Sequence, residues 1–170
     1  MLELTLLALV IAAAAVDLAR RRIPNLLLLT GWAAALPLHL LSPQPGLLSA
    51  LSGALCGLMA FLPLYLLRGM AAGDVKMMAT VGLFVGPYDA LQVAVITCCV
   101  GGVMAVAIIV GRGRARHALA NVGGLLKPIL MRVCGMPAAA EPMRHPSVGG
   151  MPYGLAIAIA TMWLLFMRHN

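Results

Sequence analysis

Two aspartates are the residues of this sequence best placed to do chemistry. Asp17 lies inside the apolar run of residues 10–18, and Asp74 follows Gly73 at the start of another apolar segment. An ionisable side chain in a membrane-spanning segment raises the free energy of insertion by roughly 2.5–3.5 kcal/mol at mid-membrane, and by less near the edge. Two carboxyl groups that share a site do not both ionise easily, so one keeps its proton. The ionised partner can then take a proton from water while the protonated one polarises a carbonyl, which is the chemistry of an aspartic protease.

Each aspartate also has a purely structural explanation. Asp74 would cap a helix N-terminus, where free amides and the helix dipole favour a carboxylate. Asp17 would pair with Arg20 or Arg21, which lie one helical turn further along the chain. Spacing alone leaves both explanations open beside the functional pair. The three remaining acidic residues are predicted at outer helix ends or in a polar loop: Glu3, Asp89 and Glu141.

The composition predicts the class of protein that positions these aspartates. The chain has 170 residues, of which 62% are hydrophobic and only 10% charged, and its mean hydropathy is +1.00. A soluble domain of this length needs more polar surface, and apolar stretches near the length of a bilayer crossing recur. We therefore predict an all-α membrane protein with a polytopic bundle of about six transmembrane helices, in a single membrane-embedded domain over residues 1–170.

The segments that form this bundle are separated by short turns and one longer loop. A polar, Pro-rich loop is predicted at about residues 111–150, where four prolines argue against one continuous helix. The fourth apolar segment is short for a full crossing, so it is either tilted or packed inside the bundle. The predicted segments cover about residues 2–19, 26–41, 47–67, 74–86, 88–110 and 151–167.

The basic residues predict which membrane face holds the aspartates. The net charge of +7 comes from Lys and Arg in short runs between apolar segments, as in cytoplasmic loops, so no nucleic-acid partner is expected. If the turn at residues 20–22 is cytoplasmic, eleven of the twelve Lys and Arg lie inside, and only Arg168 lies outside. The N-terminus is then outside, and Asp17 and Asp74 lie at the same cytoplasmic face.

Three sequence blocks around these residues resemble a known family. Residues 17–25 read Asp-Leu-Ala-Arg-Arg-Arg-Ile-Pro-Asn, residues 73–79 read Gly-Asp-Val-Lys-Met-Met-Ala, and residues 151–158 read Met-Pro-Tyr-Gly-Leu-Ala-Ile-Ala. In this order they are similar to the motifs of bacterial type IV prepilin peptidases, and the resemblance spans nearly the whole chain. It implies a multi-pass aspartic endopeptidase of the bacterial inner membrane that removes the leader of prepilins and pseudopilins at the cytoplasmic face. Asp17 and Asp74 match the catalytic aspartates.

Two departures from the family pattern narrow this expectation. The second motif usually reads Gly-x-Gly-Asp, whereas this chain has Ala71 at the first glycine position. Because alanine does not easily adopt positive φ, the backbone before Asp74 is expected to be stiffer here. The chain also lacks the cytoplasmic insertion with paired cysteines that larger members carry. It therefore resembles the short form that serves Flp, or tight-adherence, pili, without N-methyltransferase activity.

Other residues are weaker candidates for the site. Lys76 would contact an acidic group of the substrate or tune the aspartates, although a basic residue at a cytoplasmic helix end needs no special role. Tyr153 would border the site or act as an ordinary interfacial tyrosine. The residues expected to bind substrate or to support the site are Gly73, Lys76, Pro24, Asn25, Tyr153 and Gly154.

No metal site and no cofactor are expected, because the four histidines lie far apart and the four cysteines show no Cys-x-x-Cys spacing. Gly53 and Gly57, extended by Ser49, instead predict close helix packing. The expected partners are prepilin precursors and the lipid bilayer, and no pattern predicts an oligomeric state. Two other functions remain open: a non-catalytic scaffold for pilus or secretion assembly, and a component of a proton-coupled transporter.

Overall fold

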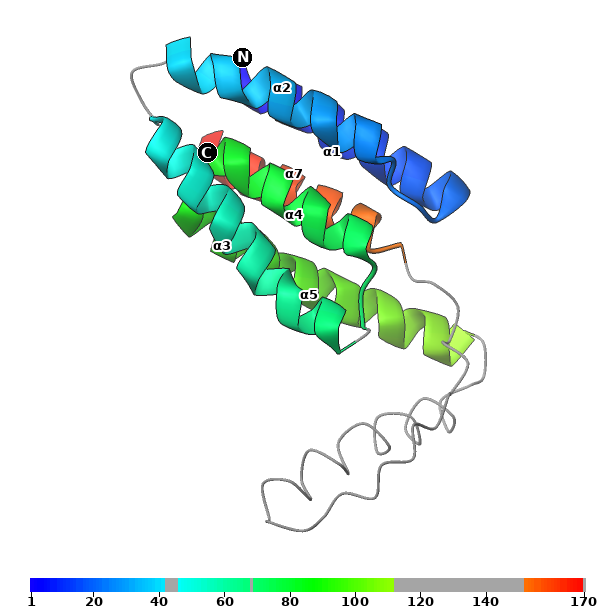
Figure 1. Ribbon diagram of the computed structural model, residues 1–170. Helices are drawn as coiled ribbons and strands as arrows, with labels where there is room; N and C mark the ends of the chain where they lie inside the picture. The colour runs from blue at the N-terminus through cyan, green and yellow to red at the C-terminus, as the bar shows by residue number, and fades with distance from the viewer. Residues whose placement is uncertain (42–45, 68, 112–151, 170) are drawn as a thin grey trace, which may run out of the picture. The chain divides into compact units, whose positions relative to one another are not determined.

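The predicted all-α class is confirmed by the structure, a computed structural model that describes residues 1–41, 46–67, 69–111 and 152–169 (Figure 1). This part of the chain contains six helices and no strand. Each predicted segment agrees with one helix to within two residues at either end. The helices are α1 (Leu2–Arg20), α2 (Asn25–Leu41), α3 (Leu47–Leu66), α4 (Ala72–Val85), α5 (Pro87–Gly111) and α7 (Tyr153–His169).

The chain divides into two compact units. One comprises residues 1–102 and 151–170, and the other residues 103–150. In the second unit, the structure describes only the C-terminal part of α5. The predicted polar loop at about residues 111–150 therefore lies outside the described residues, except for residue 111. The organisation as a single domain stays a prediction. Both aspartates belong to the first unit.

Three of the helices, α1, α3 and α5, are long and apolar enough to cross a membrane. The apolar helices α2 and α7 have 17 residues each, which corresponds to about 25 Å at the usual rise per residue. These lengths and compositions identify the chain as a membrane protein.

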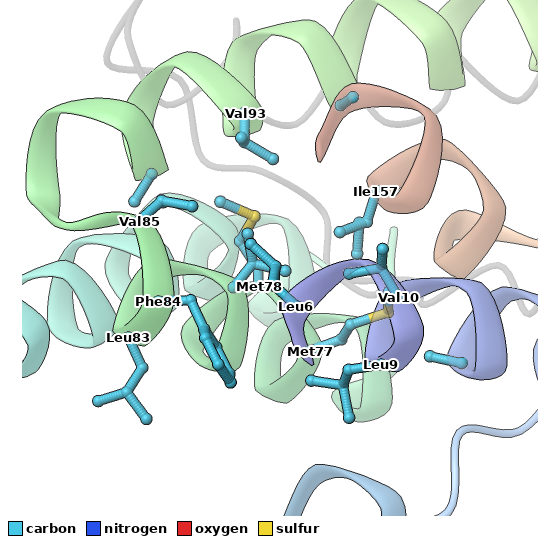
Figure 2. Close-up of a cluster of buried hydrophobic side chains, with 14 of the residues drawn as sticks. Leu6, Leu9, Val10, Met77, Met78, Leu83, Phe84, Val85, Val93 and Ile157 are labelled. Carbon is cyan, nitrogen blue, oxygen red and sulfur yellow. The ribbon is translucent and has the colours of Figure 1, made fainter. Parts of the chain in front are cut away.

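Helix α4 lies at the centre of the first unit. Every residue from Val75 to Val85 except Lys76 is buried, and α4 contacts α1, α2, α3 and α7. Figure 2 shows side chains of α4 in one buried cluster with Val10 of α1, Val93 of α5 and Ile157 of α7. A helix that is apolar on all sides is buried on all sides. Of the two explanations for its short length, the structure therefore supports packing inside the bundle.

Glycines allow α3 and α4 to approach each other closely. A Cβ atom on Gly53 would overlap the carbonyl oxygen of Gly82, and one on Gly57 would overlap the carbonyl oxygen of Met78. At the end of α4, Gly86 has a φ of 88°, and its vacant Cβ position lies 3.2 Å from the Ser49 hydroxyl. The close packing predicted from Ser49, Gly53 and Gly57 is thus confirmed.

We expect Gly82→Ala to destabilise the protein by about 1–3 kcal/mol, the usual range for overpacking. The added Cβ would lie 2.7 Å from the Gly53 carbonyl carbon, and a backbone atom cannot turn aside as a side chain can. Gly102→Ala is the matched control, since a Cβ there meets no atom within 4 Å. Thermal unfolding in detergent measures both variants. Equal midpoints for Gly82→Ala and Gly102→Ala would contradict the close approach.

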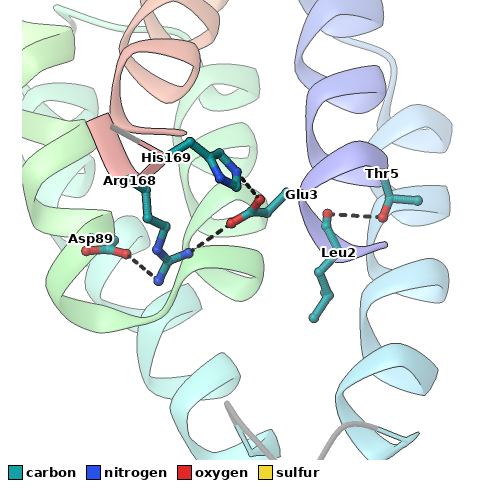
Figure 3. A network of polar contacts seen from close by, with 6 residues as sticks. All are labelled: Leu2, Glu3, Thr5, Asp89, Arg168 and His169. Atoms are coloured by element: carbon teal, nitrogen blue, oxygen red, sulfur yellow. Dashed lines mark hydrogen bonds and ion pairs between the residues drawn. The ribbon is translucent and has the colours of Figure 1, made fainter. Parts of the chain in front are cut away.

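A network of charges joins three helix ends in Figure 3. Arg168, near the end of α7, pairs with Glu3 of α1 at 3.4 Å and with Asp89 of α5 at 3.1 Å. His169 Nε2 lies 2.8 Å from the second carboxylate oxygen of Glu3. Arg168 was the one basic residue that the predicted topology places outside. The network gives it two carboxylate partners, at the end of α1 opposite to Asp17.

Candidate active site

Asp17 lies in the last turn of α1 and its side chain is buried. Arg21 ends this helix in a left-handed conformation with φ of 51°, and its N–H donates to the Asp17 carbonyl oxygen at 2.7 Å. The Asp17 carboxylate accepts a hydrogen bond at Oδ2 from the Gly154 N–H, at 2.9 Å. None of the ion pairs among the described side chains involves Asp17. The structural alternative of a pair with Arg20 or Arg21 is therefore not found.

Gly154 is suited to this contact in two ways. It lies in the first turn of α7, where the backbone N–H groups have no partner within the helix. A Cβ atom at this position would lie 2.8 Å from Oδ2 of Asp17 and 3.0 Å from its Cβ. Only a residue without a Cβ leaves room for the carboxylate beside the backbone.

Asp74 is the third residue of α4 and is also buried. Its Oδ2 accepts a hydrogen bond from the Ala71 N–H at 3.2 Å, so the carboxylate does cap the start of the helix, as the structural alternative proposes. Ala71 has φ of −81° and ψ of 152°, an extended conformation open to any residue. This conformation does not need the positive φ that alanine disfavours, and a stiffer backbone before Asp74 stays a prediction. Sequence reasoning also missed Ala71 as a donor, although its position three residues before an acidic residue is a signal for such a cap.

The two carboxylates lie close enough for their charges to interact. The C-terminal end of α1 and the N-terminal ends of α4 and α7 lie on the same side of the bundle (Figure 1). One carboxylate comes from a helix end and the other from a helix start, and each is bonded to a backbone N–H. Two buried carboxyl groups whose charges interact do not both ionise easily, so one of them tends to keep its proton, as the chemistry of aspartic proteolysis requires.

The turn after α1 packs on the start of α4. Lys76 Nζ donates to the Asn25 side-chain oxygen at 3.1 Å, on the exposed side of both helices. The Pro24 carbonyl accepts from the Leu27 N–H at 3.1 Å and so opens α2. A Cβ on Gly73 would lie 3.4 Å from the Ile23 side chain, which is ordinary contact, so glycine is not sterically required there.

Tyr153 joins this group from the start of α7. It is partly buried, and its phenol lies near enough to Asp74 for the two groups to interact electrostatically. The structure thus brings together candidates from all three sequence blocks. Among the described residues, no three His, Cys, Asp or Glu side chains gather closely enough to hold a metal ion.

Comparison with known proteins gives one match. Residues 4–106, more than half of the chain, match the family model of the type IV leader peptidase family. The matched range contains the first two sequence blocks, with Asp17 and Asp74, and ends before the block at residues 151–158. Searches among curated proteins and among solved structures gave no match.

Proposed function

The chain belongs to the type IV leader peptidase family, and on this basis we propose that it is an aspartic endopeptidase whose catalytic pair is Asp17 and Asp74. The observation that carries the proposal is the pair itself. Two buried carboxylates, 57 positions apart in the sequence, lie near enough to interact. Neither forms an ion pair with a basic side chain among the described residues. Without such a cation, the repulsion between two like charges favours a state in which one carboxyl group keeps its proton.

In the proposed reaction the ionised carboxylate takes a proton from a water molecule, and the resulting hydroxide attacks the scissile carbonyl carbon. The protonated carboxyl donates a hydrogen bond to the carbonyl oxygen and stabilises the negative charge that develops there. Collapse of the tetrahedral intermediate breaks the C–N bond, and a carboxyl proton passes to the leaving amine. The Gly154 and Ala71 N–H groups hold the two carboxylates in place through these steps. The pair titrates as a unit, so base and acid are roles of the pair.

The proposed substrate is the precursor of a Flp-type pilin, cut at the junction between its leader and its apolar helix. The excess of basic residues between the apolar segments supports a site at the cytoplasmic face of the inner membrane. The tight connection between α1 and α2 supports the short form of the family, without N-methyltransferase activity.

Co-expression with a Flp-type pilin precursor tests this proposal. We expect a shorter product, with a new N-terminus whose mass shows no added methyl group. A precursor that stays full length while both proteins are inserted in the membrane would contradict the peptidase function. A cut product with a methylated N-terminus would contradict only the assignment to the short form.

A further inference from the structure

Lys76 is the only exposed residue of α4 after Asp74. Its ammonium group donates to the Asn25 side-chain oxygen at 3.1 Å, and a cationic donor makes a stronger hydrogen bond than a neutral one. Lys76 forms no ion pair among the described side chains, and Asp74 interacts with the charge of Asp17 instead. The structure therefore gives Lys76 a partner on another helix rather than an ion pair with either aspartate.

The hydrogen bond from Lys76 attaches the start of α2 to α4, because Asn25 is the first residue of α2. The next bond between these helices joins Trp32 Nε1 to the Thr80 hydroxyl at 3.0 Å. Trp32 lies seven residues after Asn25, or about 10.5 Å further along the helix axis. Polar contacts hold neighbouring helices together in an apolar environment, but the contact of Trp32 attaches only the middle of α2. Among the hydrogen bonds of the described residues, the one from Lys76 is thus the bond that holds the start of α2.

The connection between α1 and α2, residues 21–24, also contacts α4 on the other side of Asp74. A Cβ on Gly73, the residue before Asp74, would lie 3.4 Å from the Ile23 side chain. Lys76, two residues after Asp74, holds Asn25 at the end of the connection. Movement of the connection away from α4 would therefore remove contacts on both sides of this aspartate.

The same connection is joined to Asp17. The Arg21 N–H donates to the Asp17 carbonyl oxygen at 2.7 Å, and only residues 21–24 separate α1 from α2. Helix α1 packs more extensively on α7 and on α2 than on α4. The position of Asp17 relative to α4 therefore depends on these neighbours, and a shift of the connection is transmitted to the last turn of α1, where Asp17 lies.

We propose that Lys76 is a positioning residue, whose hydrogen bond to Asn25 holds the connection between α1 and α2 against the start of α4 and so fixes the separation of the Asp17 and Asp74 carboxylates. The inference rests on the proposed function and adds what keeps the catalytic pair together. Lys76 then acts on the reaction through Asp17 and does not touch the precursor. Its loss lowers kcat, whereas the loss of a lysine that binds an acidic group of the precursor raises KM.

Lys76→Met tests the proposal by kinetics with a full-length Flp-type precursor in vesicles. Methionine is also unbranched but has no N–H to donate. We expect kcat to fall about tenfold, because a displaced reacting group slows the chemical step, and KM to stay within about twofold. Arg20→Met is the control and should keep the wild-type kcat, since Arg20 is exposed at the end of α1 and forms no ion pair among the described side chains. Wild-type kcat in Lys76→Met would overturn the proposal, and a raised KM beside it would make Lys76 a substrate contact.

An exchange of the two residues separates the hydrogen bond from the position of the charge. Both positions are exposed, so Asn25→Lys combined with Lys76→Asn can form the same bond in the opposite direction. Each single variant should lose about tenfold in kcat, as Lys76→Met does, and the double variant should recover most of this loss. A double variant as slow as Lys76→Asn alone would contradict the positioning role.

Hydrogen exchange tests the same inference without cleavage. Because the connection is no longer bonded to α4 in Lys76→Met, we expect the backbone amides of residues 21–27 to exchange several-fold faster than in the wild type and in Arg20→Met. Wild-type exchange in Lys76→Met would overturn the proposal, whatever the enzyme cleaves. Faster exchange in this variant, together with no cleavage by the wild type, would contradict the proposed function and leave the attachment of the connection by Lys76 intact.

Discussion

Asp17→Asn and Asp74→Asn should each lower the rate of precursor cleavage by roughly 10³-fold or more, within the range that loss of a general acid or base produces. Asparagine keeps the size of the side chain and can still accept from the Gly154 or Ala71 N–H. It cannot take a proton from water, nor can it share a proton with its partner. The variants should therefore remain folded and inserted while the precursor accumulates. The measurement is the rate of the size shift in purified vesicles.

The controls for these variants change two carboxylates of the same chain that lie away from Asp17 and Asp74. Glu3→Gln and Asp89→Asn alter the network around Arg168 at the other end of α1. Exposed ion pairs contribute at most about 1 kcal/mol, so both controls should cleave at nearly the wild-type rate.

The cleavage rate of the double variant distinguishes two carboxylates that act as one catalytic pair from two that contribute to the rate independently. Groups that act as a unit are strongly non-additive, so the double Asn variant should be no slower than the slower single variant. Full cleavage by either single variant would exclude the pair as the catalytic group. A multiplicative loss in the double variant would show two carboxylates that act separately.

The helices were predictable from the sequence because hydrophobic runs of membrane length have few alternatives to a helix. Each run from α1 to α5 ends at a recognisable signal, such as the basic residues 20–22 or Gly86 before Pro87. Gly53 and Gly57 predicted close packing correctly, since their spacing alone places them on one face of α3. The partner surface, Gly82 and the Met78 backbone, was visible only in the structure.

The sequence predicted that Asp17 and Asp74 lie near each other, but it did not predict the contacts that each makes. Topology and motif placed Asp17 and Asp74 together, and the structure brings them within interaction range; their catalytic role stays a prediction. The bond from Gly154 to Asp17 joins residues 137 positions apart, and no local pattern encodes such a contact. That Ala71 adopts an extended φ could not be predicted either, because φ there depends on how the chain enters α4, which composition does not reveal.

The second large effect is expected from Gly154→Ala, which should lower kcat for precursor cleavage by about 10²-fold, the loss that a displacement near 1 Å at a reacting group can produce. The added Cβ would lie 2.8 Å from Oδ2 and 3.1 Å from Cγ of Asp17, so the carboxylate must move. Its bond to the Gly154 N–H then lengthens or breaks, and its position relative to Asp74 changes. The measurement is steady-state kinetics with the precursor in vesicles.

Three readouts distinguish displacement of Asp17 from general damage. KM should stay near the wild-type value, because the substitution displaces a carboxylate that is proposed to act in the reaction step rather than in binding of the precursor. The thermal midpoint should fall only slightly, since Asp17 lies at the end of α1 rather than in its apolar middle. Gly102→Ala, which adds the same methyl group in open space, should leave kcat unchanged. A wild-type kcat in Gly154→Ala would show that the contact between α7 and Asp17 does not position the carboxylate for the reaction.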